Sequence, residues 1–303
     1  MKHMLEPGSL WPALERATLH ALQCGALQPM ESQQKLISDA GVRFVVRRLT
    51  RTARLQIARR REAARTIDTT SPVNPFLPFD RDLFVADVSP THIALVNKFS
   101  LIANHMLVVT RRFVPQEVLL DEADLAALCA CLAQIDGLIF YNGGAAAGAS
   151  QAHKHLQMVP LPLGTGGLST PIDVVLEKVR DQRDICEIPG LAFRHSFAWI
   201  GPASFEQPTS AAARLASLYP RMLEHIGIVA IERSGERYQS APWNLLVTRE
   251  WMLAVPRVRE HFNAVPINAL GFAGLLFARD DAHLATLQRA GPMAALKAVS
   301  VPD

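Results

Sequence analysis

The sequence predicts an α+β fold in which an antiparallel or mixed sheet is flanked by helices. Two pairs of apolar segments carry this prediction, because each pair is rich in Val, Leu, Ile or Trp and is joined by a turn short enough for a hairpin. The first pair is 92–99 with 105–110, and the second is 243–248 with 251–255. Helical segments gather between these hairpins instead of alternating with single strands, so the pattern favours α+β over a doubly wound parallel sheet.

The N-terminal part is expected to begin with a helix at 9–23, where Ser9 can cap it and Pro12 lies in the first turn. Residues 42–49 are expected to form a strand. An arginine-dense segment at 43–65 is interpreted as a solvated basic face, with attraction of polyphosphate as the alternative. Residues 66–82 are rich in Pro, Thr and Asp and predict a loop, which is followed by a strand at 83–88.

The clearest helix is predicted at 121–135. Asp121 is the expected N-cap and Asp124 occupies the third helical position, which gives a start that resembles a capping box. Leucines at helical spacing form its apolar stripe. The strand predicted at 138–142 then delivers Asn142 to a glycine-rich loop.

That loop runs from Gly143 to Gly148 and contains only Gly and Ala. Small residues leave backbone N–H groups bare, and glycine permits the dihedral angles of an anion-binding concavity, so we expect a phosphate cradle here. A strand at 153–158 follows, and Pro160 and Pro162 should end it. Because side chains alternate along a strand, one face carries His153, His155 and Gln157, and the other carries Lys154, Leu156 and Met158.

Three interpretations of the two histidines compete. A His-x-His pair can bind a metal, although a zinc site needs a third ligand and Gln is a poor one. The pair can also be half-buried histidines with ordinary hydrogen bonds, or the centre of phosphate chemistry. The residues alone leave these three alternatives open.

The C-terminal part begins with a glycine-rich link at 164–167 and a helix from 171 to about 183. A second helix is expected at 210–225, and the second hairpin follows. A last strand is predicted at 271–278, before terminal helices at 280–289 and 292–299. We divide the chain into halves at 1–163 and 164–303, which can also form one continuous domain.

Composition is that of an ordinary globular protein, with 303 residues, 49% hydrophobic residues and 19% charged residues. The net charge of +3 is mild and gives no indication of nucleic-acid binding. Four cysteines without a CxxC spacing are expected to be reduced thiols. No signal peptide and no apolar run of about 18 residues is visible, so we expect a cytoplasmic protein without a membrane segment. The other histidines, such as His20, have no partner spacing.

The segment at 148–157, Gly-Ala-Ser-Gln-Ala-His-Lys-His-Leu-Gln, resembles the active-site signature of the ATP adenylyltransferases, also called diadenosine tetraphosphate phosphorylases. That family belongs to the histidine-triad superfamily, in the branch of galactose-1-phosphate uridylyltransferase, where Gln replaces the last His of the triad. Other segments resemble the family in its order, namely 96–99, 104–110, 140–142, 243–248, 251–252, 256–257 and 268–274.

The resemblance implies a histidine-triad-like sheet and assigns roles within it. The implied nucleophile is His155, while His153 orients the site and Gln157 contacts phosphate without acting as a general acid. The N-terminal half would carry this nucleotidyltransferase core, and the C-terminal half would complete the sheet and the substrate pocket. The implied substrate-binding residues are Asn97, Lys98, Asn142, Gly148, Ala149, Ser150, Gln151, Asn268, Ala269, Leu270 and Arg279.

Two positions depart from the family pattern. Arg279 stands where the family carries a Lys, which keeps the charge and changes its geometry. The family also places a substrate-binding Lys in the N-terminal region, but no Lys occurs between Lys35 and Lys98.

The implied activity is phosphorolysis of diadenosine tetraphosphate to ATP and ADP through an AMP-histidine intermediate. The implied partners are a dinucleoside polyphosphate, ATP, ADP, AMP and inorganic phosphate, with no nucleic acid. No covalent cofactor and no protein-bound metal are expected, and a divalent cation such as Mg²⁺ would accompany the polyphosphate. The alternatives are an adenylyl-sulfate or other nucleotidyl transferase or hydrolase of the superfamily, and a non-catalytic nucleotide sensor.

Overall fold

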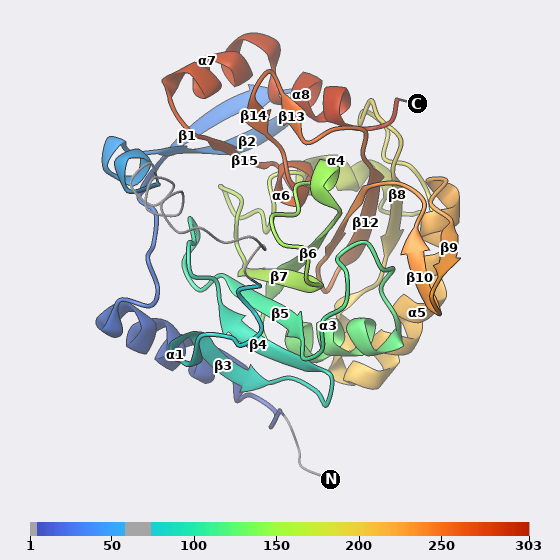
Figure 1. Cartoon of the computed structure of the whole chain (residues 1–303). Helices are drawn as coiled ribbons and strands as arrows, with labels where there is room; N and C mark the ends of the chain where they lie inside the picture. Colours follow the sequence, from blue (N-terminus) through green and yellow to red (C-terminus); the bar gives the residue numbers. More distant parts are fainter. Residues whose placement is uncertain (1–4, 58–73, 303) are drawn as a thin grey trace.

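A computed structural model describes residues 5–57 and 74–302. Its centre is an eight-stranded sheet in the order β3-β4-β5-β7-β6-β11-β12-β8, in which every neighbouring pair is antiparallel (Figure 1). The strands are β3 (Phe84–Asp87), β4 (His92–Val96), β5 (Met106–Thr110), β6 (Gly137–Gly143), β7 (His155–Pro160), β8 (Ser196–Trp199), β11 (Trp243–Val247) and β12 (Trp251–Pro256). The predicted α+β class and both predicted hairpins are confirmed.

A smaller sheet contains β1 (Ser32–Asp39), β2 (Val42–Leu49) and β15 (Leu275–Ala278). Strand β2 pairs antiparallel with β1 and parallel with β15, so this sheet is mixed. Two further hairpins join β9 (Ala230–Arg233) to β10 (Glu236–Gln239) and β13 (His261–Phe262) to β14 (Val265–Pro266).

Helices cover one face of the large sheet and the smaller sheet covers the other (Figure 1). Helices α1 (Leu10–Cys24), α3 (Glu122–Gln134) and α5 (Pro208–His225) share one apolar core with the sheet residues Leu156 and Met158. The second core joins Phe140 to the smaller sheet, α6 (Ala269–Phe272), α7 (Asp281–Ala290) and α8 (Pro292–Val299). Burial of both faces explains why the central strands are apolar throughout.

Local sequence signals located several elements correctly. Asp121 caps α3 and accepts a bond from the N–H of Asp124, whose own carboxylate bonds back to Asp121, so the capping box is real. Helix α5 begins two residues earlier than predicted, with Pro208 at its first position. Strand β7 ends at Pro160, as expected. Ser9 precedes α1 but makes no side-chain cap, because its hydroxyl donates to the carbonyl of Glu6.

Two predicted elements are wrong in part. The helix expected at 171–183 is a single turn, α4 (Asp173–Leu176), followed by a short 3-10 helix, η3 (Glu177–Val179). The strand expected at 271–278 starts only at residue 275. Its first part is the helical turn α6, because the side chain of Asn268 accepts from the N–H of Leu270 and Gly274 leaves the turn with φ +91°.

Several strands were not predicted. Strand β1 is mostly polar and largely exposed, so it lacks the apolar alternation that marks a strand. The same is true of β9 and β10. The loop predicted at 66–82 and the arginines beyond residue 57 lie partly outside the described residues, which resume at Asn74.

The large sheet continues from the N-terminal half into the C-terminal half. Strand β6 pairs with β11, and in the smaller sheet β2 pairs with β15. Within the described residues, no helix combines the length and apolarity needed to cross a bilayer.

Candidate active site

A cavity of about 650 Å³ opens on the face of the large sheet that carries His155. One side of it is apolar and includes Phe76, Phe79, Leu95 and Leu107. Its polar lining contains six of the predicted site residues, which are Asn97, Lys98, Ser150, Gln151, His155 and Gln157. The fold therefore brings together residues that span sixty positions of sequence.

His155 lies at the start of β7 and is buried. Its Nδ1 lies 2.8 Å from the carbonyl oxygen of His153. Because a carbonyl can only accept, Nδ1 carries the proton and Nε2 keeps its lone pair. Burial lowers the pKa of His155 to about 4, so the ring is neutral at physiological pH.

Gln116 fixes the backbone of His155 from both sides. Its Oε1 accepts from the N–H of His155 at 2.9 Å, and its Nε2 donates to the carbonyl of His155 at 3.2 Å. The same Nε2 donates to the carbonyl of Asn142 at 2.9 Å. Gln116 was not predicted, since it lies outside every recognised motif, and only its complete burial marks it.

His153 lies beside His155 with both ring nitrogens occupied. Its Nε2 lies 2.8 Å from the carbonyl oxygen of Thr110, and its Nδ1 lies 3.0 Å from Nδ2 of Asn74. The amide of Asn74 therefore donates to Nδ1 of His153, and the Nε2–H of His153 donates to the carbonyl of Thr110. His153 is not among the residues that line the cavity, which fits an orienting role.

Gln157 is held by a histidine that was not predicted as a site residue. Its Oε1 lies 3.0 Å from Nε2 of His105, and Asn97 Nδ2 lies 3.2 Å from Nδ1 of the same ring. Burial lowers the pKa of His105 to about 4, so the neutral ring donates through Nε2 and accepts through Nδ1. The bond from His105 orients the amide of Gln157 and leaves both of its N–H donors for a ligand. The sequence signal was a histidine inside the 104–110 segment, directly before a buried strand.

The glycine loop differs from the expected cradle of bare N–H groups. It contains a 3-10 turn, η2 (Ala145–Ala147), and its N–H groups at 144, 147, 148 and 149 donate to carbonyls of residues 142–145. Those four groups are unavailable to phosphate, so the cradle prediction is wrong for them. The loop instead places Ser150 and Gln151 at the cavity, while Gly148 packs against Asn268.

A buried arginine supports this loop from behind. The guanidinium of Arg257 donates to Asn244 Oδ1 and to four backbone carbonyls, which are those of Ala147 (3.3 Å), Arg259 (2.9 Å), Ile267 (2.8 Å) and Val299 (3.1 Å). All five partners are uncharged, and burial lowers the pKa of Arg257 to about 10. Arg257 and Asn244 were predicted only as parts of motifs, with no role assigned.

The remaining predicted residues divide into two groups. Asn142 Oδ1 accepts from the N–H of Ala269 at 3.0 Å and from Asn244 Nδ2 at 2.9 Å, so Asn142, Asn268, Ala269 and Leu270 belong to the supporting layer and do not line the cavity. Arg279 lies just beyond the end of β15 in the smaller sheet, where its exposed side chain pairs with Asp280 at 3.3 Å. It is also absent from the cavity lining.

Potential metal ligands do not gather at the histidine strand. Within the described ranges, the group of three potential ligands is His20, Cys24 and Asp82, which are all exposed. Both histidines of the strand use a ring nitrogen to donate to a carbonyl, which leaves at most one nitrogen of each for any other partner.

Two family models match most of the chain. One, described as the Ap4A phosphorylase N-terminal domain, matches residues 1–178, and the other, described as the ATP adenylyltransferase C-terminal domain, matches residues 189–302. Together with the fold and the histidine site, they place the chain among the nucleotidyltransferases. It belongs to the Ap4A phosphorylase / ATP adenylyltransferase family.

Relatives from Saccharomyces cerevisiae agree with this assignment. Diadenosine 5',5'''-P1,P4-tetraphosphate phosphorylase 2 is 27% identical over 71% of this chain and 71% of its own length. Protein APA1 is 26% identical over 62% of this chain and 61% of its own length. A crystal structure of yeast Ap4A phosphorylase Apa2 has the same fold, with a TM-score of 0.77, 21% identity and coverage of 99% of each chain. The yeast enzyme has also been solved in complex with Ap4A and with AMP.

Proposed function

We propose that the chain catalyses phosphorolysis of diadenosine tetraphosphate to ATP and ADP through a covalent AMP–His155 intermediate. The observation that carries the proposal is a neutral imidazole at the cavity, with Nδ1 donating to the carbonyl of His153 and Nε2 unprotonated. Membership of the Ap4A phosphorylase family supplies the substrate class.

In the first step, Nε2 of His155 attacks the α-phosphorus of the dinucleotide. The N–P bond forms while the bond to the bridging oxygen breaks, and ATP leaves as an anion. The positive charge that develops on the ring is stabilised by the Nδ1–H bond to the carbonyl of His153, which remains in place throughout.

In the second step, inorganic phosphate attacks the same phosphorus. The N–P bond breaks, its electron pair returns to Nε2, and ADP is released. Gln157 cannot protonate a leaving group because a carboxamide has no suitable pKa, but its N–H groups can donate to phosphate oxygens. A polyphosphate leaving group is a weak base and needs little protonation, so transfer to phosphate proceeds without an acid at this position.

The two sides of the cavity suit the two parts of a nucleotide. The apolar side formed by Phe76, Phe79, Leu95 and Leu107 can hold the adenine base. Ser150 and Gln151 offer hydrogen-bond donors to the phosphates. Lys98, whose Nζ lies 3.4 Å from Oδ2 of Asp80, provides a positive charge at the rim of the cavity. A divalent cation such as Mg²⁺ would enter with the polyphosphate.

Cysteines 24, 129, 131 and 186 are free, which fits a reducing cytoplasm.

The test is incubation of the protein with diadenosine tetraphosphate, with and without inorganic phosphate. We expect ATP and ADP in equal amounts only when phosphate is present. Release of AMP by water would instead indicate a hydrolase, formation of product only with an acceptor such as sulfate would indicate another transferase, and tight binding without products would indicate a sensor.

The covalent step has its own test. Intact mass measurement during turnover is expected to show protein carrying one AMP, and the His155→Ala variant should bind nucleotide yet show no adduct. An adduct that survives in His155→Ala would assign the nucleophile to another residue. His20→Ala, at an exposed position near the C-terminal end of α1 that does not line the cavity, is the matched control and should form the adduct as the natural chain does.

A further inference from the structure

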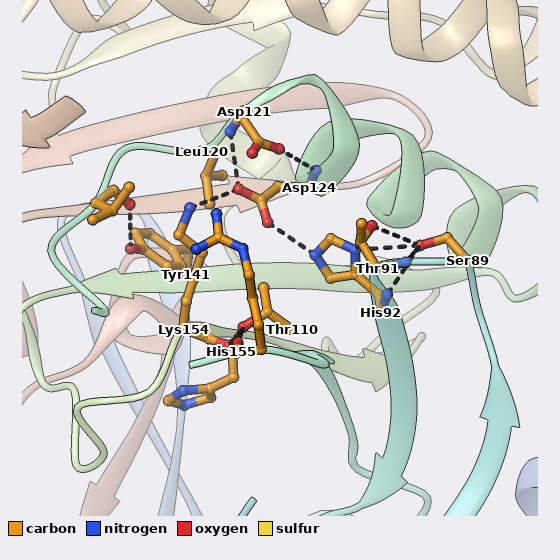
Figure 2. Close-up of polar contacts among 12 residues, drawn as sticks. Ser89, Thr91, His92, Thr110, Leu120, Asp121, Asp124, Tyr141, Lys154 and His155 are labelled. Carbon is orange, nitrogen blue, oxygen red and sulfur yellow. Dashed lines mark hydrogen bonds and ion pairs between the residues drawn. The ribbon is translucent and has the colours of Figure 1, made fainter. Parts of the chain in front are cut away.

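Lys154 separates the two histidines in sequence, and its side chain points to the opposite face of the strand. Figure 2 shows Lys154 directed towards Asp124, while the ring of His155 lies on the other side of the strand. The side chain of Lys154 is 3% exposed. Its Nζ donates to Asp124 Oδ2 at 2.8 Å and to the carbonyl of Leu119 at 2.9 Å. These two acceptors fix the orientation of the buried Lys154 side chain.

Asp124 is equally buried, and both of its carboxylate oxygens accept hydrogen bonds. Oδ1 lies 2.9 Å from Nε2 of His92, and Oδ2 accepts from the N–H of Asp121 at 2.9 Å as well as from Lys154 (Figure 2). Burial by itself would raise the pKa of this carboxyl, but the bond from His92 and the charge of Lys154 outweigh burial and hold the pKa below its usual value. Asp124 is therefore an ionised group, fixed in the first turn of α3.

The backbone connects this ion pair to the nucleophile. The carbonyl of His153 that accepts from Nδ1 of His155 belongs to the same peptide group as the N–H of Lys154, which donates to the carbonyl of Val114 at 2.7 Å. The carbonyl of Lys154 accepts from the N–H of Thr110 at 3.3 Å. Because the peptide group is planar, a change in the direction of the Lys154 N–H would also turn the His153 carbonyl relative to the imidazole.

We propose that Lys154 and Asp124 are positioning residues, which anchor the His153–Lys154 peptide to α3 and so fix the tautomer and direction of the His155 ring. The inference rests on the proposed function of His155 as the group that carries AMP. Packed apolar side chains could stabilise the fold as well as a buried ion pair does. The ion pair between Lys154 and Asp124 adds a fixed orientation of the His153–Lys154 peptide. The carbonyl of that peptide selects Nδ1 as the protonated nitrogen of His155.

The decisive variant is the double substitution Lys154→Met with Asp124→Asn. Either single change leaves a charge buried without its partner and can fail to fold, whereas the double variant removes both charges and keeps similar side-chain volumes. We expect the double variant to keep a cooperative thermal transition and to bind AMP within about twofold of the natural chain, while adduct formation in a single turnover slows roughly a hundredfold because the ring is misaligned.

Nitrogen-15 NMR of labelled histidine gives a second measurement that does not depend on turnover. In the natural chain His155 should appear as one neutral tautomer, protonated at Nδ1, and in the double variant as a mixture of the two neutral tautomers. The matched control is Leu287→Ala in α7, a fully buried position in the second apolar core, which contains no residue of α3. This change should lower thermal stability without altering the adduct rate or the tautomer.

A double variant with the natural adduct rate and a single Nδ1-protonated tautomer would overturn the positioning role and leave the proposed function intact. Absence of any adduct in the natural chain would instead defeat the proposed function. The tautomer comparison would then still decide whether Lys154 and Asp124 orient the ring.

Discussion

At the scale of single residues, a histidine can attack phosphorus only while one ring nitrogen holds a lone pair. His155 meets this requirement through two neighbours of different kinds. Burial keeps the ring neutral, and the carbonyl of His153 selects Nδ1 as the protonated nitrogen. His105 is neutral for the same reason and directs Gln157 through its Oε1. The site therefore needs no charged histidine in its resting state.

The pH dependence of adduct formation should reveal that the ring of His155 is neutral. Because the pKa of His155 is lowered from 6.5 to about 4, the ring stays neutral as the pH falls from 8 to about 5.5, and the single-turnover rate should change little over that range. The half-reaction is measured without inorganic phosphate, which titrates near neutrality. A rate that halves near pH 6.5 would show that the ring titrates as an exposed histidine does.

The same shift has a consequence for stability. Below pH 6.5 the unfolded chain takes up protons on His105 and His155, whereas the folded chain does so only when the pH reaches about 4. The contribution of these two histidines to the free energy of unfolding is therefore at its full value above pH 6.5 and is lost as the pH decreases towards 4.

Replacement of Gln157 by His tests the role of the carboxamide. Gln157→His introduces a group that can protonate a leaving oxygen and activate water, so the ratio of AMP to ADP among the products should rise at least severalfold. Chromatography of products at fixed phosphate concentration measures this ratio. Gln182→His, at an exposed position outside the cavity, serves as the control, and equal product ratios in the two variants would exclude a role for position 157 in the partition between AMP and ADP.

At the scale of elements, the loop before β7 and the turn that contains α6 support each other. Arg257 donates to carbonyls in both, at Ala147 and Ile267, and Asn142 joins β6 to the N–H of Ala269. Gly148 adopts φ +94°, and a Cβ on it would lie 2.9 Å from Cβ of Asn268. The small residues of the loop thus permit close packing of two backbone segments, where the sequence pattern suggested contact with phosphate.

Gly148→Ala and Gly166→Ala form a matched pair that separates packing from backbone strain. Both glycines have positive φ, so both variants should lose about 1 kcal/mol of stability from strain. A Cβ at Gly166 meets nothing within 4 Å, whereas at Gly148 it meets Asn268. Gly148→Ala should therefore lose a further ~1–3 kcal/mol and should weaken AMP binding. Urea unfolding and calorimetric titration measure the two effects, and equal losses in the two variants would contradict the packing argument.

At the scale of the whole molecule, both of the larger sheets contain strands from the two halves of the chain. Strand β6 of the first half has β7 on one side and β11 of the second half on the other. Strand β2 needs β15 in the same way. The second apolar core contains side chains from both halves, such as Phe140 and Leu296.

The chain should therefore unfold as one unit. We expect tryptophan fluorescence, which reports on Trp11, Trp199, Trp243 and Trp251, and far-ultraviolet circular dichroism to give coincident urea transitions. A fragment of residues 1–178 should show no cooperative transition alone, because β6 and β2 would become unpaired edges. A separate transition for that fragment would show that the first half is an independent domain.

Short-range signals in the sequence determined much of this protein. The capping box of Asp121 and Asp124, the paired apolar runs and the alternation of His155 with Leu156 are each encoded by neighbouring residues, and each depends on local hydrogen bonds or on the period of a strand. The order of helix, strand, loop and histidine strand followed from them.

Only the tertiary structure decided which distant groups meet. It pairs Gln157 with His105, Lys154 with Asp124 and Arg257 with two loops, and it turns the N–H groups of the glycine loop towards the loop itself. It also adds the polar strand β1, which is stable because β2 supplies its hydrogen bonds. Such contacts join residues far apart in the chain, so they form only when the buried polar groups of the packed molecule must find partners.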